Sequence, residues 1–266
     1  MFRFRLVFFR QMMGPRAVAC FTFDNMGEAA DVGAGLPRDL HRDDRSLSIG
    51  FRNLFALLDR HGVTATFFIE GWNGEHHADV IREIVQRGHE LGMHGWLHEP
   101  WAQLERYREM ELAARATTAL ERAAGVRPLG FRAPGGARGP HTEGILTELG
   151  YTYDASLDDH IRPRLLPSGL VQIPFVWAGV DGAYYLRPDP ADAIVVRDVW
   201  LRNLERAAKR GGLFLLICHA FITGVDERRL AALDAVMKAA VTDHRVVVRT
   251  TGAMACRLRA TKRQWR

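Results

Sequence analysis

Two histidines four positions apart are the first sign of chemistry in this chain. His94 and His98 follow a short apolar run, and Gly95 between them permits a tight backbone turn. Neutral imidazole is the commonest protein ligand for zinc, so two such rings can share one divalent cation. The zinc-protease pattern H-E-x-x-H does not apply, because Glu90 lies outside the interval and the preceding residues indicate a strand. The pair alone is compatible with a metal site or with two packed histidines.

Three more polar side chains stand in the same kind of place. Asp24, Arg132 and His219 each follow an apolar, strand-like run, as His94 does. In a barrel of parallel strands the carboxyl ends of the strands open onto one set of loops, where active sites are assembled. We therefore expect these four side chains to meet at one end of a sheet.

The elements that would position these residues alternate along the chain. Nearly all-apolar runs alternate with helical segments, which is typical of a parallel sheet covered by helices. Seven or eight such units predict one α/β domain, a TIM-like barrel, whether or not it closes. A long loop is expected over 26–45. The predicted strands are 17–23, 63–69, the run before His94, 129–132, 151–154, 170–177, 213–218 and 245–249, and the predicted helices are 46–61, 78–87, 103–124, 142–149, 193–210 and 227–241.

Composition describes an ordinary globular protein. The chain has 266 residues, of which 47% are hydrophobic and 25% charged, and it has no apolar run long enough to span a membrane. Arginines interrupt the apolar N-terminal segment, so a secretory signal is not expected. We predict a poorly ordered extension over 1–15, a barrel domain over 16–250 and a basic C-terminal helix or tail over 251–266.

Charge and cysteine usage narrow the partners and the compartment. The net charge of +5 comes mostly from arginines and lysines near both termini, without an aromatic-interleaved basic stripe, so no nucleic-acid partner is expected. Cys20, Cys218 and Cys256 are an odd number, and the first two lie in apolar runs. Buried free thiols in a reducing cytoplasm explain this better than a disulfide framework. The expected partner is a small-molecule or carbohydrate amide; a homo-oligomer is left open.

Five short motifs, in order, resemble those of the polysaccharide deacetylases, also called NodB-homology proteins or family 4 carbohydrate esterases. The resemblance covers roughly Val18 to Arg249 and is closest to the branch that holds allantoinase-like and cytosolic peptidoglycan-deacetylase-like members. The motifs are 21–25 (F-T-F-D-N, similar to T-F-D-D), 65–68 (A-T-F-F), 94–98 (H-G-W-L-H, similar to H-[ST]-x-x-H), 132–136 (R-A-P-G-G, similar to R-x-P-x-G) and 215–219 (L-L-I-C-H, similar to L-x-x-H).

This resemblance implies a distorted (β/α)7 barrel that hydrolyses N-acetyl groups with a divalent metal, zinc foremost. His94 and His98 would hold the ion. Asp24 would be the base that deprotonates the attacking water, and Arg132 would fix Asp24 in place. His219 would be the acid that protonates the leaving amine.

One position departs from the family pattern. The resemblance implies that the second Asp of T-F-D-D would be a third metal ligand, but this position is Asn25 here. Asn25 could ligate through its carbonyl oxygen, with Asp24 as base. Alternatively Asp24 ligates and the base is Glu28, Glu99 or Asp181. In a third alternative the site holds no metal.

Further candidates surround the motifs. Asp181 could orient His219. Trp96 could stack on a sugar or pack in the core, and Glu99 could support the histidines or only begin a helix. Pro134 and Trp177 are candidates to contact the substrate.

The sequence predicts a metal-dependent amide hydrolase that removes an N-acyl group, acetyl foremost, from an amino sugar or a related small molecule. An allantoinase-like hydrolase of a cyclic amide or ureide, with or without metal, is the first alternative. A catalytically inactive carbohydrate-binding barrel is the second, and Asn25 is its only support.

Overall fold

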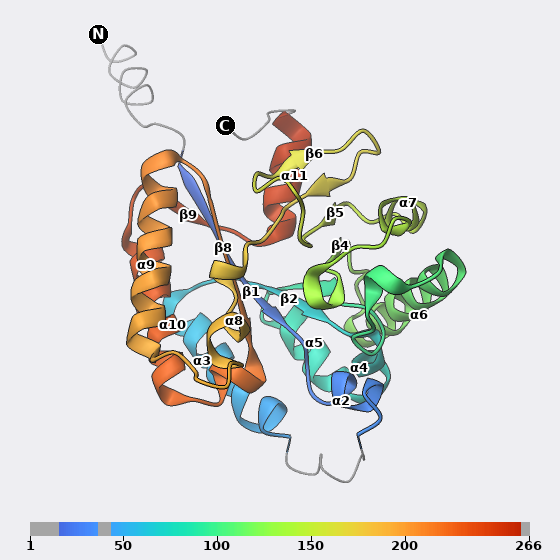
Figure 1. Ribbon diagram of the computed structural model, residues 1–266, viewed down its shortest axis with the longest axis horizontal. Coiled ribbons are helices and arrows are strands. Elements are labelled where there is room, and N and C mark those ends of the chain that lie inside the picture. The colour runs from blue at the N-terminus through green and yellow to red at the C-terminus, as the bar shows by residue number, and fades with distance from the viewer. Residues whose placement is uncertain (1–15, 37–43, 262–266) are drawn as a thin grey trace.

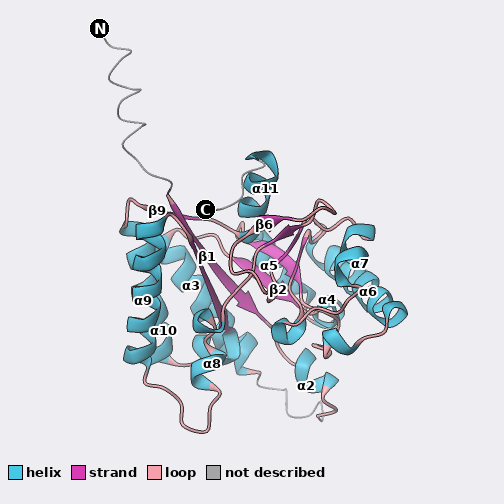
Figure 2. Cartoon of the chain, turned by 45° about the horizontal axis from the view of Figure 1, so that its top comes forward, coloured by secondary structure: helices cyan, strands magenta, loops and turns pink. Residues whose placement is uncertain are grey.

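A single curled sheet forms the centre of the computed structural model, which describes residues 16–36 and 44–261 (Figures 1 and 2). The strand order is β6-β7-β5-β4-β3-β2-β1-β8, and β9 pairs with β1. Every pairing is parallel except that between β6 and β7. The strands are β1 Ala17–Asp24, β2 Thr66–Ile69, β3 Glu90–Met93, β4 Gly130–Phe131, β5 Tyr153–Asp154, β6 Arg164–Leu165, β7 Val171–Gln172, β8 Leu213–His219 and β9 Val246–Val248.

Helices surround this sheet. In Figure 1, α9 and α10 lie side by side on one flank and α6 and α7 on the opposite flank. Within the described part of the chain, no helix is long and apolar enough to cross a membrane. The helices are α2 Ala29–Gly33, α3 Phe51–His61, α4 Gly71–His76, α5 Ala78–Gln86, α6 Arg106–Ala124, α7 Thr142–Glu148, α8 Gly182–Tyr185, α9 Ala193–Arg210, α10 Glu227–Thr242 and α11 Thr251–Thr261.

β1 is the strand on which the sheet is organised. All eight of its residues are buried, as its unbroken apolar run predicts. One edge pairs with β8 from Val18 to Asp24, and the other pairs with β9 near its start and with β2 near its end. In this register Asp24 lies directly beside His219. Two of the predicted site residues are therefore neighbours on adjacent strands.

The barrel does not close. β8 and β6 end the strand order, and a single bridge between Val180 and Ile217 crosses the seam next to β8. A cavity of about 380 Å³ lies along this seam, lined by residues from the region after β7, the end of α9 and the start of β8. The predicted fold class, a distorted TIM-like barrel, is confirmed, and the barrel is incomplete.

The structure corrects several element predictions. The predicted loop over 26–45 contains α2, and α4 and β6 were not predicted. The predicted strand over 170–177 is reduced to β7, because Pro174 has no N–H to continue a ladder. The predicted extension over 1–15 lies outside the described residues. α11 occupies most of the predicted C-terminal segment.

A polar cluster joins α11 to the amino-terminal ends of the strands. Glu90 accepts hydrogen bonds from Thr66 Oγ1 at 2.8 Å, Tyr153 OH at 2.9 Å and the Gly252 backbone N at 2.9 Å. Tyr153 OH and Thr251 Oγ1 are also 2.8 Å apart. Because each of these donors is neutral and comes from a different element, the Glu90 cluster is a structural tie.

The cysteines are free thiols. Cys20 and Cys218 are buried, and burial raises the pKa of both thiols well above the ordinary value. A buried thiol that stays protonated is a poor nucleophile. Cys218 therefore packs in the core although it precedes His219.

Candidate active site

A buried ion pair forms the centre of the site. Asp24 ends β1 and Arg132 follows β4, and the two side chains are almost fully buried. Arg132 Nη1 donates to Asp24 Oδ1 at 2.6 Å and to Thr22 Oγ1 at 2.8 Å. The guanidinium also lies over the Phe68 ring, 4.2 Å from its centroid. Asp24 is thus held in one orientation by Arg132, which follows a strand that is not a neighbour of β1.

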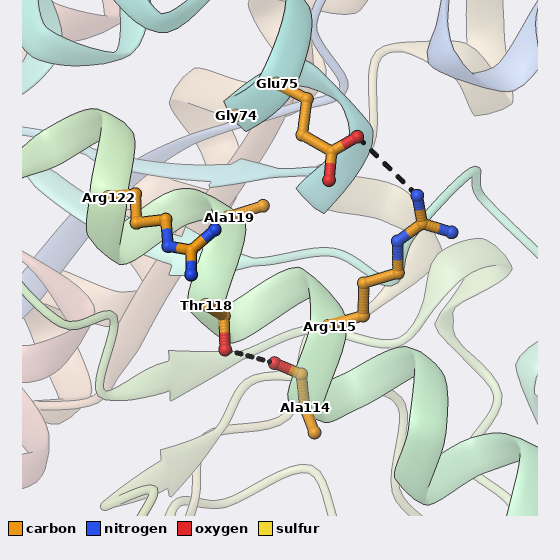
Figure 3. A pocket seen from close by; sticks show the side chains of 7 residues that line it. All are labelled: Gly74, Glu75, Ala114, Arg115, Thr118, Ala119 and Arg122. Atoms are coloured by element: carbon orange, nitrogen blue, oxygen red, sulfur yellow. Dashed lines mark hydrogen bonds and ion pairs between the residues drawn. The ribbon is translucent and has the colours of Figure 1, made fainter.

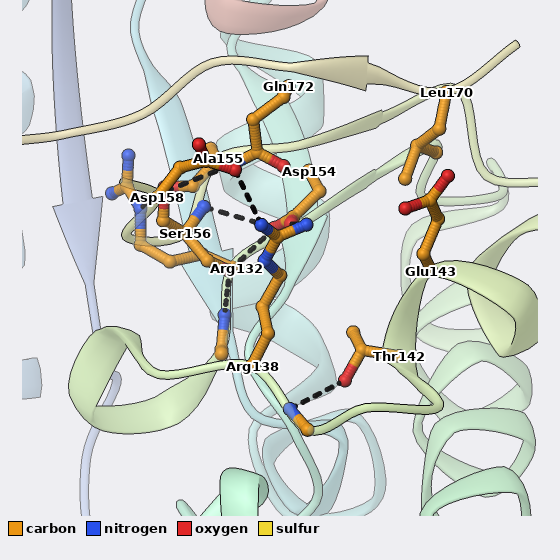
Figure 4. Close-up of polar contacts among 12 residues, drawn as sticks. Arg132, Arg138, Thr142, Glu143, Asp154, Ala155, Ser156, Asp158, Leu170 and Gln172 are labelled. Atoms are coloured by element: carbon orange, nitrogen blue, oxygen red, sulfur yellow. Dashed lines mark hydrogen bonds and ion pairs between the residues drawn. The ribbon is translucent and has the colours of Figure 1, made fainter. Parts of the chain in front are cut away.

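The loop after β5 holds Arg132 in turn (Figure 4). Arg132 Nε donates to the Ala155 backbone O at 2.9 Å. The backbone N of Ala133 donates to Ser156 Oγ at 2.8 Å, and Ser156 Oγ donates to Asp154 Oδ1 at 2.5 Å. Burial raises the pKa of Asp154 to about 6. Arg132 is fixed by a hydrogen-bonded chain that extends beyond its own motif.

The two histidines of the 94–98 motif lie together. Their ring centroids are 5.1 Å apart. His94 Nδ1 lies 2.8 Å from the Arg132 backbone O, and since a carbonyl only accepts, Nδ1 carries the proton and Nε2 keeps its lone pair. Burial lowers the pKa of His94 to about 3 and lowers that of His98 as well. Both rings are neutral at physiological pH, the form that binds a metal.

The turn between the histidines is tightly packed. Gly95 has φ of 76°, and a Cβ there would lie 2.8 Å from Pro134 Cγ and 3.0 Å from Glu99 Oε2. Glu99 accepts hydrogen bonds from the backbone N of Trp96 at 3.0 Å and of Leu97 at 2.9 Å. Glu99 therefore holds the turn, one of the two roles predicted for it, and Pro134 packs against the turn.

Two candidate ligands have unusual backbone conformations. Asn25 and His98, each with φ of 63°, are the non-glycine residues with positive φ among those that the structure describes. Asn tolerates this left-handed region better than most residues, whereas His requires support from its surroundings. Such residues cluster at functional sites.

Glu70 belongs to the site and was not predicted. It follows β2 and is fully buried. Its Oε1 accepts from Asn25 Nδ2 at 2.6 Å, and its Oε2 accepts from the Met26 backbone N at 3.1 Å and Asn73 Nδ2 at 2.9 Å. Burial raises the pKa of Glu70 to about 7, against the hydrogen bonds that lower it. The sequence does contain an indication of Glu70, because this polar residue directly follows a predicted strand.

His219 is hydrogen-bonded to Asp181, the residue expected to orient it. His219 Nδ1 lies 2.6 Å from Asp181 Oδ1, and the His219 backbone N and Thr223 Oγ1 donate to Asp181 Oδ2 at 2.8 and 2.6 Å. Burial of His219 alone would lower its pKa, but the charge and hydrogen bond of Asp181 outweigh burial and raise it. His219 is therefore suited to keep a proton on Nε2.

The donor set fits a divalent ion with a neutral third ligand. No three His, Cys, Asp or Glu side chains in residues 16–36 and 44–261 are placed to hold a metal together. Asp24 is bound by Arg132, which disfavours the alternative with Asp24 as ligand. His94 Nε2, the His98 ring and Asn25 Oδ1 remain as one oxygen and two nitrogen donors, which suit zinc.

The tryptophan candidates lie in two different settings. Trp96 is only 4% exposed, and the Arg115 guanidinium lies 3.7 Å from its ring centroid. Trp96 thus packs against α6, which is the packing alternative given for it. Trp177 is 53% exposed and packs edge-on against Phe175. Its surface remains available to a substrate.

Glu28 and the outer surface contribute little to this site. Glu28 Oε1 lies 3.8 Å from His77 Nε2, outside the Asp24, Arg132 and His94 contacts described above. A surface hollow of about 660 Å³ lies between α4 and α6, where Glu75 and Arg115 form an ion pair at 3.5 Å (Figure 3). None of the predicted site residues lines that hollow. The candidate catalytic and metal-binding residues lie at the carboxyl ends of the strands instead.

Comparisons with known proteins agree with the motifs. The family described as "Polysaccharide deacetylase" matches residues 15–153. The peptidoglycan deacetylase-like protein FGM2 of Gibberella zeae is 34% identical over 114 residues, 42% of this chain and 34% of that protein. This chain spans less than half the length of the first curated relatives it matches.

Solved structures extend the likeness to nearly the whole chain. A Mycobacterium smegmatis protein, assigned by name to the polysaccharide deacetylases, is 30% identical with a TM-score of 0.86, covering 95% of this chain and 94% of that one. Puue allantoinase shares the fold at 20% identity with a TM-score of 0.82, covering 93% of this chain and 92% of that one.

Proposed function

We propose that this chain, which belongs to the polysaccharide deacetylase family, is a hydrolase that removes an N-acyl group, acetyl foremost, from an amino sugar or a related small molecule. The observation that carries the proposal is the juxtaposition of Asp24 and His219. They are register partners on β1 and β8, and a separate buried residue orients each of them. A carboxylate and an imidazole fixed side by side provide a base and an acid for amide hydrolysis.

Asp24 is the base in this proposal. Its Oδ1 is bound by Arg132, so Oδ2 is the oxygen that accepts the proton of the attacking water. The hydrogen bond within this ion pair also fixes the orientation of the carboxylate. Loss of either partner would leave the other charge buried without compensation, which is costly. Arg132 acts by positioning Asp24 and not by contact with the substrate.

His219 is the acid. Its Nδ1–H is directed to Asp181, which leaves Nε2 to deliver a proton to the nitrogen of the leaving amine. The charge and hydrogen bond of Asp181 raise the pKa of His219, which extends the protonated form of the ring to higher pH. Loss of the amine as a neutral group completes cleavage of the carbon–nitrogen bond.

His94, His98 and Asn25 are the residues that would hold a divalent ion, zinc foremost. When bound, such an ion would polarise the amide carbonyl and lower the pKa of water. The Arg132 backbone carbonyl that orients His94 belongs to the residue that positions Asp24. The ligand pair and the base are therefore held by one loop.

Replacement of the histidines tests the proposal. We expect His94→Ala and His98→Ala each to lose bound zinc, measured by elemental analysis, and turnover of an N-acetylglucosamine oligomer. His61→Ala is the matched control, since His61 lies outside the site and pairs with Asp234. Full turnover in either site variant, with the control unchanged, would contradict the metal-dependent hydrolase.

A second candidate function is hydrolysis of a cyclic amide or ureide. Asn25 favours this candidate, because a neutral ligand weakens a metal site while it leaves the Asp24–Arg132 and His219–Asp181 pairs intact. Turnover of hydantoin or allantoin that persists in the presence of a chelator would support this candidate. Absence of all turnover with retained glycan binding would instead indicate an inactive barrel.

A further inference from the structure

We infer that Glu70 is a positioning residue for Asn25, whose amide it turns so that Oδ1, and not Nδ2, is presented as a ligand with His94 and His98. With a divalent ion bound, Glu70 would carry, one residue removed from the ligand, the negative charge that a ligating Asp would carry itself. The inference deepens the proposed function and rests on its metal site.

The orientation of the amide follows from hydrogen-bond chemistry. The two ends of an Asn amide differ, since Nδ2 donates and Oδ1 accepts. Asn25 Nδ2 lies 2.6 Å from Glu70 Oε1, and a carboxylate oxygen accepts. With Glu70 ionised, the NH2 end faces Glu70, and Oδ1 lies on the opposite side of the amide group.

Sheet register brings Asn25, Glu70 and His94 to the same edge. Asp24 pairs with Phe68 across β1 and β2, and Ile69 pairs with Met93 across β2 and β3. Backbone hydrogen bonds continue one step further, from Asn25 N to the Phe68 O at 3.2 Å and from His94 N to the Ile69 O at 2.9 Å. The three side chains thus leave adjacent strand ends.

Glu70 itself is held firmly. Its second oxygen accepts from the Met26 backbone N and from Asn73 Nδ2, which anchors it to the turn after β1 and to α4. Glu70 is 0% exposed, and within residues 16–36 and 44–261 no Lys, Arg or His forms an ion pair with it. A buried carboxylate without a cationic side chain is costly. A divalent ion on Asn25 and the two histidines would supply the compensating positive charge.

The first test is Glu70→Gln with zinc affinity as the measurement. The glutamine amide of this variant can pair with Asn25 in either orientation, so the fixed presentation of Oδ1 is lost. We expect zinc affinity, determined by competition with a chromophoric chelator, to fall about 10- to 100-fold. Glu90→Gln is the matched control: this carboxylate also accepts several hydrogen bonds, but at the other end of the strands, and we expect the zinc affinity of the variant to equal wild type.

The second test exchanges the charge between the two residues. Asn25→Asp alone places two carboxylates in contact, and we expect the melting temperature of the metal-free protein to fall by about 3–6 °C. The double variant Asn25→Asp/Glu70→Gln restores one acceptor and one donor at the contact. We expect it to recover most of that loss and to bind zinc at least as tightly as wild type.

The outcomes separate this inference from the proposed function. Wild-type zinc affinity in Glu70→Gln, no recovery in the double variant, or a wild-type protein that binds no zinc would each overturn the role of Glu70. If these results are as expected but wild type hydrolyses no N-acyl amine, the proposed function fails and the role of Glu70 stands.

Discussion

The two ends of the strands each contain a carboxylate held by several hydrogen bonds, yet the two carboxylates have different surroundings, and Glu70 is fully buried whereas Glu90 is only partly buried. Glu90, at the amino-terminal ends, is bound by three hydroxyls and one backbone N–H. Glu70, at the carboxyl ends, lies beside Asn25 and near the Asp24–Arg132 pair. Neutral donors close the first cluster, whereas charged groups and oriented rings dominate the second.

This difference separates structural from chemical uses of buried polarity. In the Glu90 cluster the donors and the carboxylate satisfy one another, so the cluster stabilises the attachment of α11. In the site, one atom of each oriented group faces away from its partner: His94 Nε2, His219 Nε2 and Asp24 Oδ2. An atom that faces away from the protein partner of its group in this way can act on a ligand. Variants at the two ends should therefore affect different measurable properties.

The largest effect is expected at Asp24. Asp24→Asn keeps the shape and can still accept from Arg132, but an amide cannot take a proton from water. We expect kcat to fall about 10²- to 10⁴-fold, with a circular dichroism spectrum like that of wild type. Unfolding of the variant, in place of inactivity in a folded protein, would show that the pair serves stability at this end too.

A smaller and pH-dependent effect is expected at Asp181. Asp181 raises the pKa of His219, so its replacement by Asn lowers that pKa. The acid form of His219 is lost as pH rises through its pKa, and the alkaline limb of the kcat/KM profile should move to lower pH. Above both pKa values, activity falls about 10-fold for each unit of the shift. An alkaline limb unchanged from wild type would remove His219 from the role of acid.

The smallest effect is expected in the Glu90 cluster. Tyr153→Phe removes the hydroxyl that contacts both Glu90 and Thr251. We expect the free energy of unfolding, measured by denaturant titration, to decrease by about 1–2 kcal/mol, with kcat and KM like those of wild type. A large loss of turnover would break the division between the two ends.

Much of the site was predictable because parallel strands impose a common geometry. Asp24, His94, Arg132 and His219 each follow an apolar run, and the carboxyl ends of parallel strands share one edge. The same rule applied to the residue after Ile69 would have identified Glu70. It was not predicted because no familiar motif includes it.

Other features depended on packing that local sequence does not encode. Trp96 lies between the two histidines of the motif, two residues from each, yet its ring lies under Arg115 of α6. Glu99, next to His98, binds backbone N–H groups of its own turn. Residues in a tight turn point in diverging directions, so closeness in sequence does not place two side chains in one site.

The amino-acid sequence by itself determined the alternation of strands and helices, the barrel class and the motif residues, because apolar periodicity and short motifs are local properties. Only the tertiary structure decided which groups those residues contact. Asn25 and Glu70 are 45 residues apart, and Asp181 and His219 are 38 apart. Each contact exists because the sheet register aligns two distant chain segments, and the orientation of an amide or an imidazole follows from the partner found there.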